Sequence, residues 1–377
     1  MKRKLNILAG DKALWFIFFL ISVISLIAVY STIGLSAIAE QGSTPSAVFF
    51  KHVGIVVATY VAIIVLSHIN YRFFSKASMW LFYISIVLLL VVMMMHGERW
   101  IKLPGGLSFQ PSEIAKIALL VFLARNLALN KEHLEDPRSM LGLLLPVAVI
   151  CLLVVFENLS TGILIFLACY ITLYFGGVNK RVWWKGMAIM AGLAAVGFLV
   201  LYLVGDQVDF ARSGTWGHRL QAWIHPNPDE LTQENMAKMA IARGGFFGNG
   251  IGTTIHGRLM TQAHNDFIYA IIIEEAGLIA AIGIFMLYAW FYFRCIRIAT
   301  RCNGLFGSLC VAGIGTVIFL QAMVHMSVSV GLLPVTGQTL PFISYGGTAY
   351  LFLGFGIGVI QSVAADNKRQ EKLKIEN

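Results

Sequence analysis

Ten long apolar runs follow one another along the chain, and most polar residues gather between them. A bilayer core about 30 Å thick is crossed by roughly 20 residues of apolar helix, and each run is close to that length. The pattern predicts an all-α, polytopic membrane protein with ten transmembrane helices. The expected spans are residues 13–33, 48–67, 78–96, 112–129, 140–156, 160–176, 184–204, 266–293, 304–330 and 344–364.

One connection is much longer than the others. Residues 205–265 separate the seventh and eighth runs, and connections of that length are usually functional or disordered. This one carries Trp216, Trp223, a helical pattern near residues 230–242 and a cluster of glycines between Gly244 and Gly252, so an ordered loop is expected. We expect one membrane domain over residues 1–377, with an N-terminal segment (1–12), seven spans (13–204), the large loop (205–265), three spans (266–364) and a tail (365–377).

The composition supports membrane insertion and explains the charge. Hydrophobic residues make up 58% and charged residues 12% of the 377 residues, against roughly 45–50% and 25% in soluble domains, which excludes a soluble enzyme and a disordered chain. The net charge of +9 could indicate nucleic-acid binding or the positive-inside bias of membrane proteins. If Met1 is cytoplasmic, 19 of the 28 Lys and Arg residues lie on the cytoplasmic side. The charge therefore predicts cytoplasmic termini and an extracytoplasmic 205–265 loop, and it requires no nucleic acid.

The first run follows a basic start and precedes small residues, as in a signal peptide. Its length of about 20 apolar residues exceeds the 7–15 of a signal peptide, so an uncleaved first span is expected.

Charged side chains inside membrane spans are costly and are functional candidates. Glu113 and Lys116 follow Pro111 and Ser112 at the predicted outer start of the fourth span, where proline and serine suit a helix N-terminus. Their i,i+3 spacing places them on one helix face. They form either a structural ion pair or the wall of a polar cavity.

A second group marks the start of the eighth span. Asp266 lies where the loop becomes helix, a good position for a general base, although an N-cap role is an equal alternative. His264 is a candidate metal ligand, but without partners at ligand spacing a polar surface role is the better interpretation. At 100° per residue, at most one of Glu274 and Glu275 can share a cavity with Asp266.

Two further segments lack regular patterns. Residues 334–347 form the last outer loop, with two prolines and with Ser344 and Tyr345 leading into a glycine pair; they form either a plain tight loop or the wall of a wet cavity. The glycines of residues 244–252 could form an anion nest, since Arg219 and Arg243 are near in sequence, but they match no phosphate-binding fingerprint.

Four ordered motifs resemble the SEDS family (shape, elongation, division and sporulation), which includes FtsW and RodA. Ten spans, cytoplasmic termini and a large outer loop after the seventh span are also similar. The resemblance covers about residues 10–365, and alanine before His264 favours FtsW over RodA. The motifs are Arg99-Trp100-Ile101, Phe109 to Lys116, Ala263 to Ile268 and Thr339 to Gly347.

The resemblance implies a peptidoglycan glycosyltransferase that polymerises lipid II at the outer face of the cytoplasmic membrane for septal wall synthesis. It implies a class B penicillin-binding protein and other division proteins as partners. Asp266 matches the essential outer-loop aspartate of the family, Glu113 and Lys116 match its cavity pair, and Arg219 matches an arginine early in the large loop. Further candidate substrate contacts are Arg243, Arg99, His264, Ser344 and Tyr345.

The chain departs from the family pattern at three places. Glu157-Asn158 stands where a Pro-Asp pair is usual, Arg243 replaces the serine of Ser-Gly-Gly, and Thr336 replaces a lysine. The first and third departures bear on secondary cation or substrate contacts and leave Asp266 untouched.

The implied reaction needs a base for the attacking sugar hydroxyl and positive charge for the leaving pyrophosphate. We expect Asp266 to act as the base or to hold a divalent cation, Mg or Mn; no other cofactor is expected. Lys116, Arg219 and Arg243 are the expected pyrophosphate contacts. The alternatives are a lipid II flippase, an elongation-specific RodA-type polymerase, and a catalytically silent division scaffold.

Overall fold

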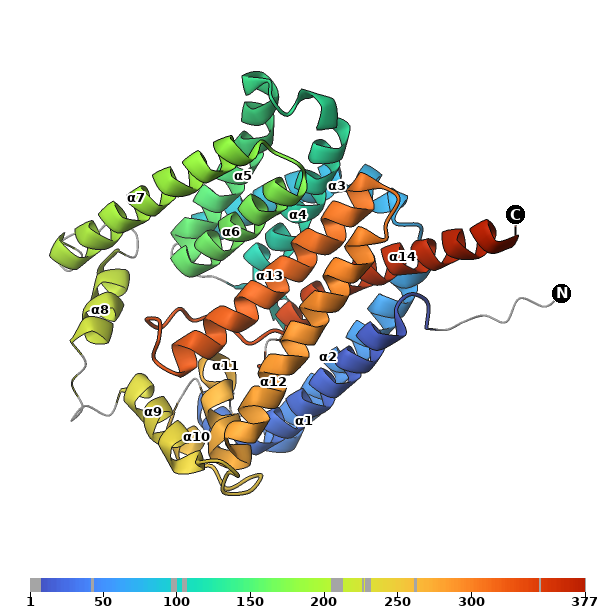
Figure 1. The fold of residues 1–377 in the computed structure, drawn as a ribbon. Helices are drawn as coiled ribbons and strands as arrows, with labels where there is room; N and C mark the ends of the chain where they lie inside the picture. Colours follow the sequence, from blue (N-terminus) through green and yellow to red (C-terminus); the bar gives the residue numbers. More distant parts are fainter. Residues whose placement is uncertain are drawn as a thin grey trace.

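The computed structural model of the chain describes residues 8–41, 44–95, 100–103, 107–204, 213–225, 227, 232–260, 263–345 and 347–376. Over these residues the molecule is a bundle of long helices with shorter helices gathered at one end (Figure 1). The all-α expectation holds except for one short antiparallel hairpin, in which β1 (Ile101–Leu103) pairs with β2 (Leu107–Phe109) just before α4.

Eight of the described helices are long and apolar enough to cross a membrane. Two further helices coincide with expected spans. The fourth, α4 (Pro111–Leu129), contains Glu113, Lys116 and Arg125, and the sixth, α6 (Leu159–Phe175), is 17 residues long. The polytopic membrane fold is confirmed, and the count of ten remains a prediction. The eight are α1 (Lys12–Gln41), α2 (Pro45–His68), α3 (Arg72–Met94), α5 (Pro137–Glu157), α7 (Lys180–Val204), α12 (Ile268–Thr300), α13 (Leu305–Ser329) and α14 (Thr348–Glu376).

Local sequence sets where several helices begin. Pro111 occupies the first turn of α4, as predicted, where its missing N–H leaves no hydrogen bond unmade. Asp136 caps α5 by accepting a hydrogen bond from the backbone N–H of Arg138. Asn158 ends α5 and caps α6, accepting from the N–H groups of Ser160 (3.0 Å) and Thr161 (3.3 Å).

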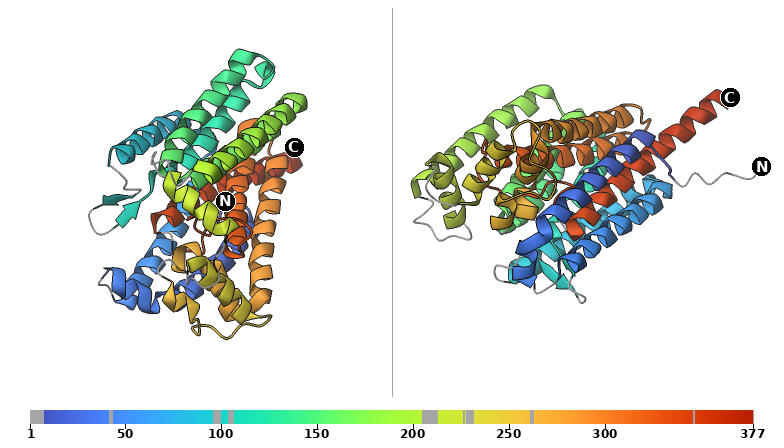
Figure 2. Two further views of the ribbon diagram at one scale, coloured as in Figure 1. Left: turned by 90° about the vertical axis from the view of Figure 1, so that its left-hand side faces the viewer. Right: turned by 90° about the horizontal axis from the view of Figure 1, so that it is seen from below.

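The helices α4, α13 and α14 form the interior of the bundle. The α13 helix packs against α4, α6, α12 and α14, while α14 lies along α2 (Figure 2). The α7 helix stands at the edge of the bundle, and none of its residues 180–200 is buried by the rest of the described chain. Buried apolar side chains of α1, α4, α6, α12, α13 and α14 form one continuous core.

The start of α1 and the far part of α14 lie at the same end of the bundle. Gln361 of α14 accepts a hydrogen bond from the backbone of Asp11 (2.6 Å), and Lys368 donates to the carbonyl of Gly10 (2.7 Å). Arg294, near the end of α12, pairs with the carboxylate of Asp11. This arrangement agrees with the prediction that both ends of the chain face one side of the membrane.

The opposite end holds the large connection and the last loop. The described residues of the connection form four short helices: α8 (Ser213–Ile224), α9 (Gln233–Gly244), α10 (His256–Leu259) and α11 (Ala263–Asp266). The predicted helical pattern near residues 230–242 corresponds to α9. A single 3-10 turn, η1 (Lys131–His133), lies between α4 and α5.

Several predicted spans differ at their ends from the observed helices; the first, expected over residues 13–33, corresponds to a helix over Lys12–Gln41. The tenth was expected over residues 344–364, but α14 begins at Thr348 and continues to Glu376. The eighth was expected over residues 266–293, whereas α12 begins at Ile268 and ends at Thr300. Apolar runs mark membrane thickness rather than helix length, so polar helix extensions were missed.

A backbone break interrupts α12 at Gly277, whose φ of 76° and ψ of −178° belong to a region that is essentially open only to glycine. Residues 245–250 supply backbone hydrogen bonds to α12 on both sides of the break. The four replacement bonds run from Asn249 N to Glu274 O (3.1 Å), Gly250 N to Glu275 O (2.9 Å), Leu278 N to Gly245 O (3.0 Å) and Ile279 N to Phe246 O (3.4 Å).

Substitution of Gly277 by alanine is expected to destabilise the fold by about 1–3 kcal/mol for the backbone strain alone. A Cβ there would lie 2.3 Å from the carbonyl oxygen of Phe246, which adds steric overlap. Gly283 is the matched control, because it lies on the same helix and its Cβ would meet nothing within 4 Å. Thermal unfolding in detergent should show a lower midpoint for G277A than for G283A. Equal midpoints would contradict a structural requirement for glycine at the break in α12.

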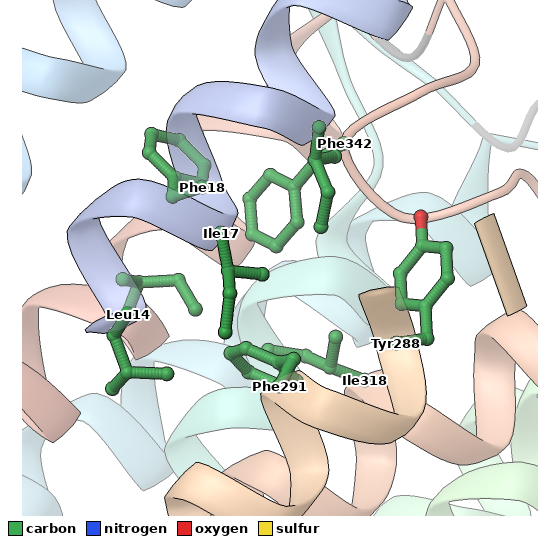
Figure 3. Close-up of a pocket in the computed structure, with 9 residues that line it drawn as sticks. Leu14, Ile17, Phe18, Tyr288, Phe291, Ile318 and Phe342 are labelled. Atoms are coloured by element: carbon green, nitrogen blue, oxygen red, sulfur yellow. The ribbon is translucent and has the colours of Figure 1, made fainter. Parts of the chain in front are cut away.

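The last loop is held down on the core by aromatic packing. Phe342 adopts φ 61°, uncommon for a non-glycine residue, and its ring meets that of Phe18 edge-on, with 5.2 Å between centroids. Tyr288 of α12 donates a hydrogen bond to the carbonyl of Pro341. These side chains surround a void of only about 10 Å³ between α1, α12 and α13, which indicates a tightly packed floor beneath the loop (Figure 3).

Candidate functional site

A polar cavity of about 240 Å³ lies at the end of the bundle that carries the large connection. It is built from the N-terminal ends of α4 and α6, from α8 and α11, and from the loop that follows α13. Its lining residues are Trp100, Gln110, Glu113, Asn158, Thr161, Arg219, Asn265, Asp266, Gly337, Gln338, Thr339 and Ala349.

Asp266 and Arg219 face the same point of this cavity. A Cβ on Gly337 would lie 3.9 Å from Oδ2 of Asp266 and 4.0 Å from a terminal guanidinium nitrogen of Arg219. Both side chains are half-buried. The glycine, with φ 66°, thus leaves the space between an acid and a cation open. A side chain at this position would enter that space.

The N-cap alternative for Asp266 is not supported. Asp266 is the last residue of α11, and the residue that caps α12 is Phe267, with φ −127° and ψ 19°. The preceding carbonyl, that of Asn265, accepts a hydrogen bond from the hydroxyl of Ser344 (2.8 Å). The same hydroxyl accepts from the backbone N–H of Leu340 (2.8 Å), so Ser344 joins α11 to the last loop.

Arg219 is shared between the cavity and its surroundings. It donates to the carbonyl of Val335 (3.4 Å), beside Gly337. Burial raises the pKa of Glu234 on α9, and the charges of Lys238 and Arg219 lower it. Arg219 therefore has acidic groups of two elements in its field, Asp266 of α11 and Glu234 of α9.

Glu113 and Lys116 form the predicted ion pair, and they share a helix face as predicted. The Lys116 ammonium is completely buried and lies 3.0 Å from each carboxylate oxygen of Glu113. Its third donor goes to Oε1 of Gln321 on α13 (2.7 Å). All three donors are thus used inside the protein, and only Glu113 of the pair lines the cavity.

A layer of buried polar side chains holds the last loop from behind. Gln321 donates to the carbonyl of Thr339 (3.0 Å), and His325 donates through Nδ1 to the carbonyl of Gln338 (2.7 Å). The side-chain amide of Gln338 donates in turn to the hydroxyl of Thr161 on α6. The cavity wall is therefore fixed from α4, α6 and α13 together.

Gln321 and His325 were not among the predicted site residues, although the sequence carries a signal for them. Both are polar residues within an apolar run, and their i,i+4 spacing places them on one face of α13. Asn158, noted as a departure from the family pattern, lines the cavity while its side-chain oxygen caps α6.

Several predicted site residues lie elsewhere. Arg243 pairs with the buried carboxylate of Glu274 (2.7 Å) and does not line the cavity. Tyr345 packs between α1 and α2, with its ring 5.6 Å from that of His52. The side chain of His264 and the whole of Arg99 lie outside the described residues.

The glycine cluster and the two glutamates of α12 also serve other purposes. Gly245 and Gly250 make backbone hydrogen bonds to the break in α12, and the backbone N–H of Gly252 donates to the carboxylate of Glu275. Glu274 and Glu275 both bind residues of that connection, so neither shares the cavity with Asp266. This agrees with the expectation that at most one of the two could do so.

The cavity is lined by a cation, Arg219, which can bind an anion, and by a carboxylate, Asp266, which can accept a proton. Among the described residues, no three His, Cys, Asp or Glu side chains come together as a preformed metal cage. A magnesium ion is often held by one or two carboxylates with water and substrate phosphates, and Asp266 can supply one such carboxylate. The arrangement suits a substrate that brings both a hydroxyl and a phosphate.

The fold and the cavity define a polytopic membrane protein with an acid–cation site at one end of its helix bundle. The family model described as cell cycle protein, FtsW/RodA/SpoVE, matches residues 11–369, and the chain belongs to this family.

The curated relatives carry consistent names. The chain is 32% identical over 374 residues to the probable peptidoglycan glycosyltransferase FtsW of Hydrogenovibrio crunogenus, covering 92% of each chain. It is 29% identical over 334 residues to the peptidoglycan glycosyltransferase MrdB of Escherichia coli K12, covering 85% of this chain and 87% of that one. The family resemblance seen in the sequence is thereby confirmed.

A solved structure supports the fold. The chain superimposes with a TM-score of 0.73 on one chain of a peptidoglycan synthase complex described for its coordination of polymerization and crosslinking. The match covers 96% of this chain and 99% of that one, at 22% sequence identity. At that identity the likeness concerns the fold alone.

Proposed function

We propose that this protein is a peptidoglycan glycosyltransferase that polymerises lipid II at the outer face of the cytoplasmic membrane. One observation carries the proposal: the Asp266 carboxylate and the Arg219 guanidinium flank one open point of a polar cavity. The names of the curated relatives support the reaction type.

In the proposed reaction, the C4 hydroxyl of one lipid-linked disaccharide attacks C1 of another. The new C1–O4 bond forms as the bond from C1 to the pyrophosphate oxygen breaks, with inversion at C1. Asp266 accepts the hydroxyl proton, and the pyrophosphate leaves with the bonding electron pair towards Arg219. In an alternative role, Asp266 holds a divalent cation, Mg or Mn, that supplies positive charge to the pyrophosphate.

The contacts on Lys116 and Arg243 narrow the set of proposed pyrophosphate ligands. Lys116 spends its three donors on Glu113 and Gln321, and Arg243 is committed to Glu274. Arg219 is therefore the cation that we assign to the leaving group. Lys116 is assigned to holding Glu113 and, through Gln321, the last loop.

We propose that the protein works with a class B penicillin-binding protein, which crosslinks the new glycan. A chain of the same fold belongs to a complex that coordinates polymerization and crosslinking. The alanine before His264 favours a division role at the septum. The relatives include both FtsW and MrdB, so an elongation role is the alternative.

Reconstitution in vesicles tests the function against its alternatives. The protein and its penicillin-binding partner are supplied with labelled lipid II on one leaflet, with Mg or with a chelator. Glycan strands are the expected product. Loss of leaflet asymmetry without glycan would identify a flippase, and neither activity would identify a scaffold; dependence on the added ion would assign the cation role.

A further inference from the structure

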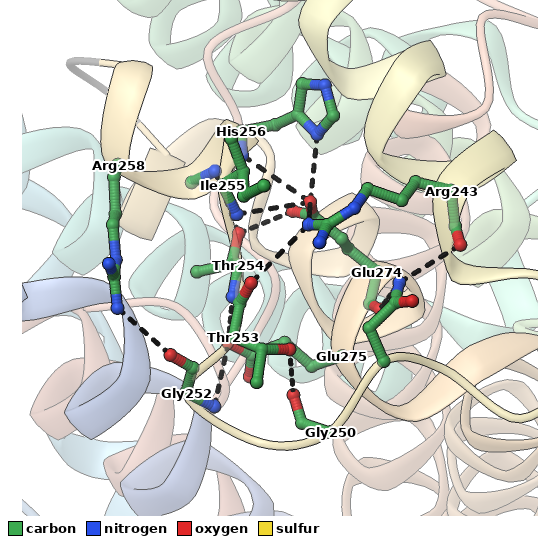
Figure 4. Close-up of polar contacts among 12 residues, drawn as sticks. Arg243, Gly250, Gly252, Thr253, Thr254, Ile255, His256, Arg258, Glu274 and Glu275 are labelled. Atoms are coloured by element: carbon green, nitrogen blue, oxygen red, sulfur yellow. Dashed lines mark hydrogen bonds and ion pairs between the residues drawn. The ribbon is translucent and has the colours of Figure 1, made fainter.

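The carboxylate of Glu274 is an anchor far from the cavity. It is fully buried on α12, just before the break at Gly277, and it accepts hydrogen bonds from four residues (Figure 4). We name these residues with Glu274 the Glu274 cluster. The donors are Arg243 NH1 (2.7 Å), Ile255 N (3.2 Å), His256 N (3.5 Å), His256 Nδ1 (2.9 Å) and the hydroxyl of Thr254.

The cluster fastens the segment that leads to Asp266. Thr254 has the central place, because its hydroxyl donates to Glu274 and accepts from the backbone N–H of Gly257 (2.9 Å) in α10. The neighbouring carboxylate of Glu275 accepts from the backbone N–H of Gly252 (3.1 Å) and from the hydroxyl of Ser31 on α1. Glu275 of α12 thus binds both the connection and α1.

Close packing transmits this attachment towards Asp266. A Cβ on Gly257 would lie 2.6 Å from Cδ1 of Ile271, so α10 rests directly on the start of α12. Met260 and Phe267, on either side of α11, belong to one buried cluster with Ile271. Densely packed side chains transmit displacement rather than absorbing it. A shift of α10 would therefore move the residues that flank Asp266.

We infer that Thr254 is a positioning residue for Asp266, acting through Glu274 and the first turn of α10. The inference rests on the proposed function for its link to catalysis. Glu274 lies on α12, whereas Asp266 ends α11, and Glu274 does not line the cavity. Arg243 belongs to the Glu274 cluster, so its positive charge is used to hold Glu274 rather than to bind pyrophosphate.

The test compares two substitutions that differ in one hydroxyl. Thr254→Val keeps the side-chain shape and removes the hydroxyl, whereas Thr254→Ser retains it. Because a 1 Å misplacement can cost about 100-fold in rate, we expect T254V to lower kcat by roughly tenfold with little change in KM. T254S should keep most of the wild-type kcat. Lipid II polymerisation by the complex with the partner is measured over a range of lipid II concentrations.

Arg258→Ala provides a matched control from the same connection. Arg258 is exposed and donates to the carbonyl of Gly252 (3.1 Å), but it does not bind Glu274. R258A should polymerise lipid II at the wild-type rate. Arg243→Gln is the second variant from the Glu274 cluster and should lower kcat in the same way. It tests the inference if T254V folds poorly.

Amide hydrogen exchange separates this inference from the proposed function. T254V should accelerate exchange of residues 255–260 and 268–271, which carry the packing, and T254S should not. Unchanged exchange in T254V, or faster exchange with an unchanged kcat, would overturn the positioning role. An inactive wild-type complex would instead contradict the proposed function, while the exchange result would still test whether the cluster orders the segment.

Discussion

Replacement of Asp266 by asparagine is expected to lower the rate of lipid II polymerisation by about 10²–10⁴-fold, the contribution of a positioned general base. The amide has the shape of the carboxylate but cannot take the hydroxyl proton, and it is a weak ligand for a hard cation. The rate of glycan formation by the reconstituted complex measures the loss. Thermal unfolding and binding of the penicillin-binding partner should stay at wild-type values.

Asp136→Asn is the matched control for this change. Asp136 also stands at a helix end, but it only caps α5 by accepting one backbone hydrogen bond. Asparagine caps as well as aspartate, so D136N should be fully active. If D266N kept its polymerising activity, Asp266 would be neither the base nor an obligatory cation ligand, and the proposed mechanism would be wrong.

The sequence was sufficient to predict the membrane bundle because a bilayer imposes a length on every apolar helix. It also predicted the start of α4 at Pro111 and the shared face of Glu113 and Lys116, which follow from local helix geometry. It could not predict the second partner of Lys116, since Gln321 lies 205 positions away in the chain. Whether the ammonium group was free to bind substrate depended on that distant contact.

The break in α12 shows the same limit. A glycine in an apolar run is common in membrane helices, so Gly277 gave no signal by itself. The break is stable because residues 245–250 replace its lost hydrogen bonds, and this pairing depends on how the connection folds back onto α12. The sequence spacing of the glycines in that connection allowed an anion nest but could not reveal that Gly245 and Gly250 bond to the backbone of α12.

Some features of the candidate site could be predicted from the sequence, and others required the structure. The motifs placed Asp266 and Arg219 in one connection, yet 47 positions and two helices separate them. Gly337, which leaves the space between them open, comes from a third segment. The sequence therefore identified the participants, whereas the open point that they face required the folded chain.

Substitution of Lys116 by methionine is expected to destabilise the protein by about 3–5 kcal/mol, because it leaves the carboxylate of Glu113 buried without its cation. Glu113 is 6% exposed and Lys116 is fully buried, so water cannot replace the lost partner well. The side-chain oxygen of Gln321 would also lose the hydrogen bond that it accepts from Lys116. The free energy of unfolding, measured by denaturant titration in mixed micelles, should fall by this amount.

Two further variants identify the cause of the loss. Lys76→Met is the control, since Lys76 is exposed on α3 and its replacement should leave the unfolding free energy nearly unchanged. Adding Glu113→Gln to K116M removes the orphaned charge and should recover part of the stability. A K116M protein that is as stable as the wild type but has a raised KM for lipid II would contradict the buried anchor, because that combination requires Lys116 to contact the substrate directly.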